Sequence, residues 1–460
     1  MSPTAMIRLL VLAGVLALAA IRWERAFVMS LPFLVVLNGL ALPVGGVSLH
    51  LDQLVACALV VPLAASTLIG ARRIRLDATS WFLAAILTVN AVASVLNSPA
   101  RSYSLLQCVN LASAWVIYVL LINFLERRED LDAFLERASM AAVAACVVAV
   151  GAFVLALGGL SIGGAEVSTS AAQRLTAAYG AYGTMVEPNI LGNFAAAYLV
   201  LAIVLLATPS ESSAGPSRRL LRWVVATTSV ALVLTFTRGA WLGALAAMVV
   251  AAFRVRGFAK LGRMQLRRAA APLVAMIALV VVLLLLPGDA GTLFRFKLTN
   301  LLNVASQTAI VRVVSYAVAL QQALDHVFIG WGTFTFAPLV AQGNDFQQFT
   351  DWRNLWIGNY VILAFHDTGV VGLGLWLAML GNLFRRGLRD GAAEPTTLAL
   401  TIAFASVLVS FLATSGFSLG YSWLMLGMLG AHLRVARAER QEATVPAESA
   451  IVDPEPSPVG

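Results

Sequence analysis

Long apolar segments alternate with short polar connections along almost the whole chain. Thirteen runs are apolar enough to be candidate membrane spans, since a spanning helix needs roughly 20 mostly apolar residues. The pattern predicts an all-α polytopic membrane protein with about 12–13 transmembrane helices. With approximate ends, the runs cover residues 5–21, 26–44, 51–70, 79–96, 105–125, 138–159, 188–207, 221–236, 240–253, 270–287, 358–384, 396–413 and 417–433.

Two of these runs leave alternatives open. The run at 240–253 is short, and the string Thr237-Arg238-Gly239 separates it from the preceding run. The two runs on either side of this string therefore form either two spans or one re-entrant hairpin. The first run, 5–21, resembles the apolar region of a signal peptide, but the many spans that follow favour an uncleaved first helix.

The composition agrees with a membrane protein and excludes an ordinary soluble enzyme. Hydrophobic residues make up 60% of the chain and charged residues only 12%, whereas a soluble domain carries about 25% charged residues. Cys57, Cys108 and Cys146 lie in apolar runs without CxxC spacing, so we expect neither a disulfide framework nor a zinc site. No metal or cofactor is expected.

The net charge of +8 is not taken as a sign of a nucleic-acid partner, because in a polytopic chain basic residues report membrane topology. One set of alternate connections holds 23 of the 31 Lys and Arg residues. The positive-inside rule places this set, and with it the C-terminus, in the cytoplasm. These connections carry the basic residues at 22–25, 72–75, 127–137, 218–222, 254–268, 385–389 and 434–440.

The connections also divide the chain into regions. Two outer segments, 160–187 and 288–357, are long, so we expect any chemistry to face outward. The last residues are rich in Glu, Pro, Ala and Ser and are predicted to be disordered. The predicted regions are N-terminal spans at 1–159, central spans with an outer loop at 160–287, a large external loop at 288–357, C-terminal spans at 358–435 and a cytoplasmic tail at 436–460.

Four arginines, Arg174, Arg238, Arg312 and Arg353, stand on the predicted outer side near the lipid boundary. A planar guanidinium binds phosphate oxygens through two parallel hydrogen bonds, and a lipid-linked pyrophosphate is the anion expected at that depth. A structural alternative stays open. The chain uses Arg almost to the exclusion of Lys, and arginines at span ends commonly extend toward head groups.

Four short strings accompany these arginines. In the first, an apolar span runs into a Thr-Arg-Gly turn and restarts with Trp, at a place where glycine allows close backbone approach. The others are a helix entry with proline in its first turn, an arginine-led amphipathic stretch before a glycine-bracketed loop, and a polar entry to a late span. In order, they are Thr237-Arg238-Gly239-Ala240-Trp241; Arg174 with Glu187-Pro188-Asn189 and Asn193; Arg312 with Gly330-Trp331-Gly332; and Asn359-Tyr360 with His366-Asp367-Thr368-Gly369.

In this order the strings resemble the O-antigen ligase and O-antigen polymerase superfamily of bacterial membrane glycosyltransferases, over roughly residues 160–385. The resemblance implies a helical fold of the glycosyltransferase C type in the bacterial inner membrane, with an active site facing the periplasm beneath the long loop. It implies a glycan donor on undecaprenyl pyrophosphate, a glycan or lipid A core as acceptor, and membrane lipids as surroundings. A chain-length regulator is left open as a further partner.

The resemblance also assigns roles to individual residues. Arg238 and Arg174 match arginines that are plausible pyrophosphate ligands, and Arg312 matches the arginine of the periplasmic helix. At the position where a ligase carries its His-Asn histidine this chain has Gly358, followed by the matching Asn359. A ligase would use that imidazole to take the proton from the acceptor hydroxyl. Its absence favours a polymerase over a ligase.

The remaining candidates have two interpretations each. His366 and Asp367 are either catalytic, with Asp367 as a general base, or structural, as a packed imidazole and a partner for an arginine. Aromatic rings such as that of Trp331 either stack on sugars or populate the membrane interface. The substrate-binding candidates are Asn189, Asn193, Asn359, Trp331 and Arg353.

The expected function is polymerisation of O-antigen or exopolysaccharide repeat units on the outer side of the inner membrane. Ligation of a glycan to lipid A core is the alternative within the same superfamily. A flippase for lipid-linked oligosaccharide is the alternative from another class. Within the spans Asp367 is the clearest acidic residue, and this scarcity argues against an ion-coupled transporter.

Overall fold

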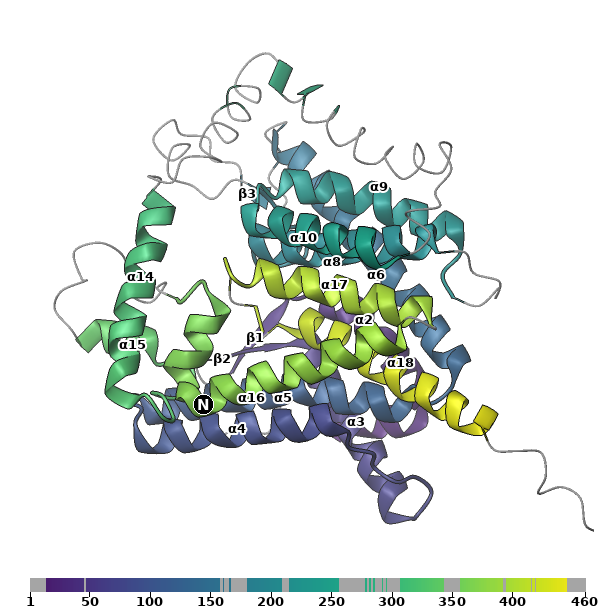
Figure 1. Ribbon diagram of the computed structural model, residues 1–460, viewed down its shortest axis with the longest axis horizontal. Coiled ribbons are helices and arrows are strands. Elements are labelled where there is room, and N and C mark those ends of the chain that lie inside the picture. Colours follow the sequence, from purple (N-terminus) through teal and green to yellow (C-terminus); the bar gives the residue numbers. More distant parts are fainter. Residues whose placement is uncertain are drawn as a thin grey trace, which may run out of the picture.

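The computed structural model is helical along most of the chain (Figure 1). It describes residues 14–157 apart from 45 and 46, residues 160, 165–166, 180–208 and 215–255, single residues between 278 and 295, and residues 307–342, 356–391 and 394–444 apart from 415 and 418. The N-terminal half contains α2 (Glu24–Val35), α3 (Leu51–Leu68), α4 (Ala78–Leu96), α5 (Arg101–Phe124) and α6 (Arg128–Leu157).

The second half begins at α8 (Pro188–Ala207), which the chain enters through a proline that suits the first turn of a helix. It continues with α9 (Arg218–Leu234), α10 (Arg238–Arg254), α14 (Gln307–Ala323), η1 (Leu324–His326), α15 (Phe336–Gln342), α16 (Tyr360–Asp390), α17 (Pro395–Ser410) and α18 (Gly420–Thr444). Two short hairpins complete the described elements, β1 (Ala41–Val44) with β2 (Val47–His50) and β3 (Ala165–Glu166) with β4 (Gly180–Ala181).

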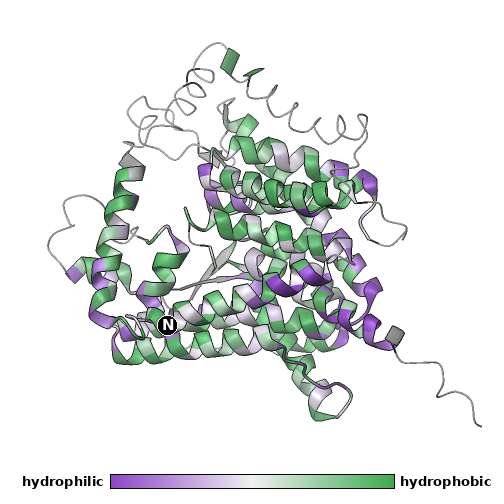
Figure 2. Cartoon of the chain, in the orientation of Figure 1, coloured by the Kyte–Doolittle hydropathy of each residue, from purple (hydrophilic) through white to green (hydrophobic). Residues whose placement is uncertain are grey.

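Six of the described helices, α3, α4, α5, α6, α8 and α16, are long and apolar enough to cross a membrane. Most of the helices are coloured as hydrophobic along much of their length in Figure 2, as expected for helices in lipid. The prediction of an all-α polytopic membrane protein is therefore confirmed. The predicted span at 270–287 lies outside the residues that the structure describes, except for single positions.

The centre of the bundle is α8, which is buried along most of its length. It packs between α9, α10 and α17. Both helices contact α8, but α9 packs in addition against α6 and α10 against α17. Each has 17 residues, so they are two separate helices. The alternative of one short re-entrant hairpin around Arg238 does not describe this arrangement.

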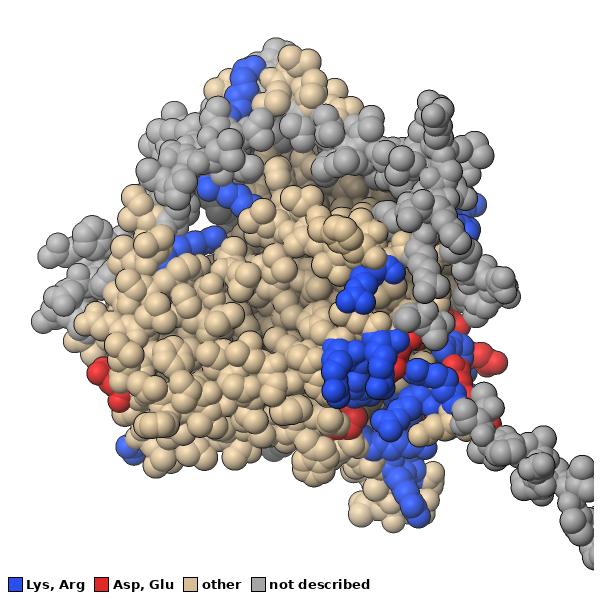
Figure 3. Space-filling model, in the orientation of Figure 1, with Lys and Arg blue, Asp and Glu red and all other residues tan. Residues whose placement is uncertain are grey.

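Charged side chains gather at one end of the bundle, which we call the basic end and define by Arg72, Arg128, Arg386 and Arg434 (Figure 3). Ion pairs and hydrogen bonds connect helix termini there. Arg128, at the start of α6, pairs with Glu394 before α17 and Glu439 in α18. These contacts place the starts of α4, α6 and α17 with the ends of α5, α16 and α18, as the alternation of basic connections predicts.

The opposite end carries the turn before α10 and the loop after η1, and we call it the loop end. Several elements differ from the predicted boundaries. Helix α2 ends at Val35, and residues 41–44 of the run predicted at 26–44 form strand β1. Helix α6 begins at Arg128, ten residues before the apolar run, because its acidic first turns lie at the basic end. Helix α18 continues to Thr444, so residues 436–444 of the segment expected to be disordered are helical, since Arg440 pairs there with Asp390.

Candidate functional site

The Thr-Arg-Gly turn at the loop end is built from specific contacts. Helix α9 ends before Phe236, whose φ of 51° reverses the chain, and the indole Nε1 of Trp241 donates to the carbonyl of Leu232 at 2.9 Å. That bond satisfies one of the last carbonyls of α9. The hydroxyl of Thr237 donates to the carbonyl of Pro188 at 3.2 Å. The tryptophan and threonine of the string therefore hold the turn in place.

Glycines in this region allow helices to approach closely. A Cβ atom on Gly239 would lie 2.9 Å from the Cβ of Ala413, just after α17, and one on Gly243 would overlap Ser410. A Cβ on Gly192 of α8 would lie 2.9 Å from Thr237. Such distances are shorter than van der Waals contact, so larger residues would push the helices apart. The backbone around Arg238 is fixed by α8 and α17.

Arg238 is the member of this string whose side chain remains exposed. Partial burial lowers the pKa of its guanidinium, and the positive charge of Arg312 on α14 lowers it further. The two arginines are therefore within electrostatic reach of each other. Arg238 also stands at the N-terminus of α10, where the helix dipole is already positive. This concentration of positive charge is unfavourable by itself and favours an anion.

Gly358 lies beside Arg312. A Cβ atom on Gly358 would be 3.3 Å from the hydroxyl of Tyr316, 3.6 Å from the carbonyl oxygen of Ala413 and 3.9 Å from Nε of Arg312. Ala413 thus contacts both Gly358 and Gly239, the residue after Arg238. The two arginines approach the end of α17 from two elements, and Gly358 faces Arg312.

Tyr316 is a residue that the sequence analysis did not select. It follows Arg312 by one helical turn, and that spacing places both on one face of α14. Burial raises the pKa of its phenol, with the charge of Arg312 acting in the opposite direction. The hydroxyl is therefore protonated at neutral pH and can donate a hydrogen bond. The sequence signal that could have identified Tyr316 is its position four residues after Arg312, which places it on the same helix face.

The asparagines near these residues have structural contacts. Asn193 is buried, and its amide donates to the hydroxyl of Thr414 at 2.8 Å. Asn359 caps α16 by accepting from the backbone of Val361, and its amide donates to the carbonyl of Leu412 at 3.0 Å. Both side chains connect α8 or α16 to the segment after α17. Asn189, one turn before Asn193, is half-buried.

His366 and Asp367 lie elsewhere, inside the bundle beneath the glycine-bracketed loop. His366 has no exposed surface. Its Nδ1 is 2.8 Å from a carboxylate oxygen of Asp367, and its Nε2 is 3.1 Å from the amide oxygen of Gln322. The second carboxylate oxygen of Asp367 accepts from the backbone N–H of Phe334 at 2.9 Å. Both side chains are thus engaged in connecting α16 to α14 and the loop.

The loop Gly330-Trp331-Gly332 rests on a kink in α16. Its backbone N–H groups of Trp331 and Gly332 donate to the carbonyls of His366 and Asp367, each at 2.9 Å. The kink is at Gly369, with φ 61° and ψ −165°, a conformation open essentially to glycine alone. The ring of Trp331 packs edge-on against His326, and its Nε1 donates to the carbonyl of Gln322.

The site residues predicted from the sequence thus form two separate groups, and two of them lie outside the described residues. Arg238 and Arg312 come together near Asn359, whereas His366, Asp367 and Trp331 support the loop. Arg174 and Arg353 lie outside the described residues. Within the described part of the chain, no group of three or more His, Cys, Asp or Glu side chains could hold a metal ion.

The fold is that of a polytopic helical membrane protein in which Arg238 and Arg312 lie near one end of the bundle. Residues 223–377, from α9 into α16, match the family model described as O-antigen ligase. The match covers 155 of the 460 residues, so this segment of the chain is similar to the O-antigen ligase family. The resemblance found in the sequence is confirmed, and the match includes Arg238 and Arg312. No curated protein matches the chain.

Proposed function

We propose that the protein polymerises the repeat units of a surface or exported polysaccharide, using an undecaprenyl-pyrophosphate-linked oligosaccharide as donor. The observation that carries the proposal is that Arg238, at the N-terminus of α10, and Arg312, on α14, both lie near Ala413 at the end of α17. A diphosphate provides the anionic charge that this arrangement favours. The hydrophobic carrier of the diphosphate would lie in the surrounding lipid.

In the proposed reaction an acceptor sugar hydroxyl attacks the anomeric carbon of the donor. The new C–O bond forms as the bond from that carbon to the pyrophosphate oxygen breaks, and the electron pair leaves with the pyrophosphate. Arg238 and Arg312 stabilise the charge that develops on this leaving group, an effect that is strongest where donors are fixed in advance. The hydroxyl proton passes, directly or through water, to the departing pyrophosphate oxygens.

Gly358 supports the choice of a polymerase over a ligase. The Cβ contacts of Gly358 show that its position faces Arg312 and Tyr316, so an imidazole there would stand beside the leaving group. Because glycine has no side chain, the substrate can occupy the space beside Arg312 and Tyr316. We assign the protonated hydroxyl of Tyr316 to orienting donor or acceptor oxygens. We assign His366 and Asp367 to a structural role, in which they connect α16 to α14 and to the loop that follows it.

The basic end is proposed to face the cytoplasm and the loop end the periplasm, by the positive-inside rule. In a variant without native cysteines, Val186→Cys at the loop end is expected to react with a membrane-impermeant maleimide in intact cells. Glu442→Cys in α18 is expected to react only after lysis. Both positions are exposed, so the reverse labelling pattern would mean that the orientation is inverted.

The function is tested with the purified full chain in nanodiscs that contain an undecaprenyl-pyrophosphate oligosaccharide. A ladder of longer lipid-linked glycans is the expected product. Transfer only after addition of a lipid A core acceptor would instead show a ligase that works without the usual histidine. In sealed vesicles, movement of the donor between leaflets without any new glycosidic bond would show a flippase.

A further inference from the structure

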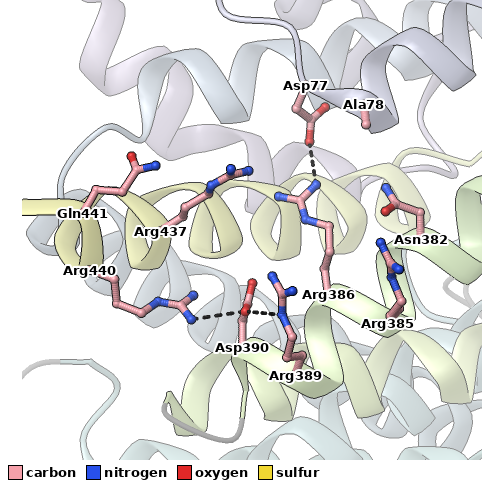
Figure 4. Close-up of a pocket in the computed structure, with 10 residues that line it drawn as sticks. All are labelled: Asp77, Ala78, Asn382, Arg385, Arg386, Arg389, Asp390, Arg437, Arg440 and Gln441. Atoms are coloured by element: carbon pink, nitrogen blue, oxygen red, sulfur yellow. Dashed lines mark hydrogen bonds and ion pairs between the residues drawn. The ribbon is translucent and has the colours of Figure 1, made fainter. Parts of the chain in front are cut away.

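A second site lies at the basic end, far from the paired arginines. A cavity of about 620 Å³ opens there between the start of α4 and the ends of α16 and α18. Helix α16 begins beside the first site and continues for 31 residues to this cavity, so the two places are about 40 Å apart along the helix. Figure 4 shows its lining residues: Asp77, Ala78, Asn382, Arg385, Arg386, Arg389, Asp390, Arg437, Arg440 and Gln441.

Five arginines and two aspartates line this cavity, so it carries excess positive charge. Asp390 takes part in ion pairs with Arg389 at 3.3 Å and Arg440 at 3.1 Å. Asp77 lies 3.8 Å from a guanidinium nitrogen of Arg386 and also accepts hydrogen bonds from Ser80 and Tyr118. The two carboxylates are therefore already engaged by residues of the protein.

Arg385 and Arg437 remain available to a ligand. Neither makes an ion pair with any residue that the structure describes, in contrast to Arg386, Arg389 and Arg440. They come from different helices and line the same space (Figure 4). Guanidinium groups converging from α16 and α18 are suited to bind phosphate oxygens. The positive-inside rule accounts for arginines at this end but not for their convergence on one cavity.

A smaller cavity of about 270 Å³ adjoins the first. The two share Asp77, Arg386, Arg437 and Gln441, and the smaller one adds Arg75 and Arg434. Arg386 and Arg437 thus line both compartments. Two adjoining compartments with shared arginines can accept two phosphate groups of one molecule.

The surface beside the larger cavity is apolar and exposed. On α16, Leu377 is 56% exposed, and a Cβ atom on Gly374 or Gly381 would meet nothing within 4 Å. These positions lie at helical spacing on the face that leads to Arg385. On neighbouring α4, Trp81 is 63% exposed one turn after the cavity, as is typical of tryptophan at head-group depth. Acyl chains can therefore lie against α4 and α16 with their head group in the cavity.

We propose that these two cavities bind the phosphate head group of an anionic glycerophospholipid from the leaflet at the basic end, with a preference for a lipid that carries two phosphates. The continuity of the charged cavity with an exposed apolar helix face favours a lipid over a soluble phosphate. Basic pockets between transmembrane helices recognise such head groups. The bound lipid would connect the ends of α16 and α18 to the start of α4.

The test is native mass spectrometry of the full chain in detergent, with diphosphatidylglycerol, phosphatidylglycerol and phosphatidylcholine titrated separately. Wild-type protein is expected to retain diphosphatidylglycerol most strongly and phosphatidylcholine least. The double variant Arg385→Gln/Arg437→Gln removes the two arginines that make no ion pair with a described residue. It is expected to bind diphosphatidylglycerol about tenfold more weakly or worse. The elongation activity of this variant should stay unchanged, because neither residue belongs to the proposed catalytic site.

The matched control is Arg219→Gln with Arg222→Gln, which removes the same charge from exposed positions at the start of α9. Its lipid affinity is expected to change by less than about twofold, because a surface charge away from the cavity is screened. Equal losses in the two double variants would overturn the proposal and show general surface attraction.

The comparison of the three lipids on the wild-type protein does not depend on the folding of any variant. Equal retention of diphosphatidylglycerol and phosphatidylcholine would overturn the proposal. So would displacement of the lipid by inorganic pyrophosphate at equal concentration, which would identify a soluble anion as the ligand.

Discussion

Replacing Arg238 with alanine is expected to lower the rate of glycan transfer by about 100-fold or more, because loss of one preorganised donor to a developing charge has a cost of this size. The fold should be retained, since the side chain is exposed and Trp241 and Thr237 hold the turn. The measurement is the initial rate of elongation in nanodiscs. Melting temperature serves as the check on folding.

Arg238→Lys separates charge from geometry. Lysine keeps the positive charge but loses the planar fork of donors, so we expect a rate between those of wild type and Arg238→Ala. The elongation rate of Arg312→Ala should fall to a level similar to that of Arg238→Ala. The rate of the double variant should fall by less than the product of the two single effects, because both groups act on one leaving group. The control is Arg222→Ala, an exposed arginine at the basic end. Unchanged elongation by Arg238→Ala would remove the central support for the proposed site.

Replacing Gly369 with valine is expected to destabilise the fold by about 3 kcal/mol or more, from backbone strain and overlap together. Its φ of 61° and ψ of −165° exclude other residues, and a Cβ there would lie 2.4 Å from the carbonyl group of Phe328. Activity should fall with it, because the kink supports the loop that follows α14, the helix that carries Arg312. Thermal unfolding in detergent measures the loss of stability, and the elongation rate in nanodiscs measures the loss of activity.

A matched control stands five residues further along the same helix. Gly374→Ala places a methyl group where nothing lies within 4 Å, so we expect no loss of stability and a gain of about 1 kcal/mol or less. Asp367→Ala should also lower the melting temperature, because it leaves His366 and the N–H of Phe334 without their acceptor. A Gly369→Val protein as stable as Gly374→Ala would contradict the described kink.

Much of the site was visible as sequence strings, but the role of each residue depended on its contacts. The Thr-Arg-Gly-x-Trp string correctly marked the turn, because glycine, proline and tryptophan patterns are local. The string with His366 and Asp367 did not reveal that both side chains are buried and hydrogen-bonded. That burial comes from residues 322–334, which pack against the kink from a different part of the chain.

The sequence by itself determined the class of protein. Apolar runs of spanning length and the distribution of arginines over alternate connections are properties of local stretches, so they could be read without any knowledge of packing. They gave the helical membrane fold and the division into a basic end and a loop end. The order of the four strings gave the resemblance to the O-antigen ligase family, which the match of residues 223–377 supports.

Only the tertiary structure decided which of the candidates lie close together. Arg238 and Arg312 are 74 residues apart in the sequence. They approach the same place because Gly239, next to Arg238, and Gly358, beside Arg312 of α14, both lie against Ala413 after α17. Likewise, arginines of α16 and α18 surround one cavity because both helices end beside α4. Contacts between helices distant in sequence depend on side-chain volume and backbone approach across the whole bundle, and no local pattern encodes them.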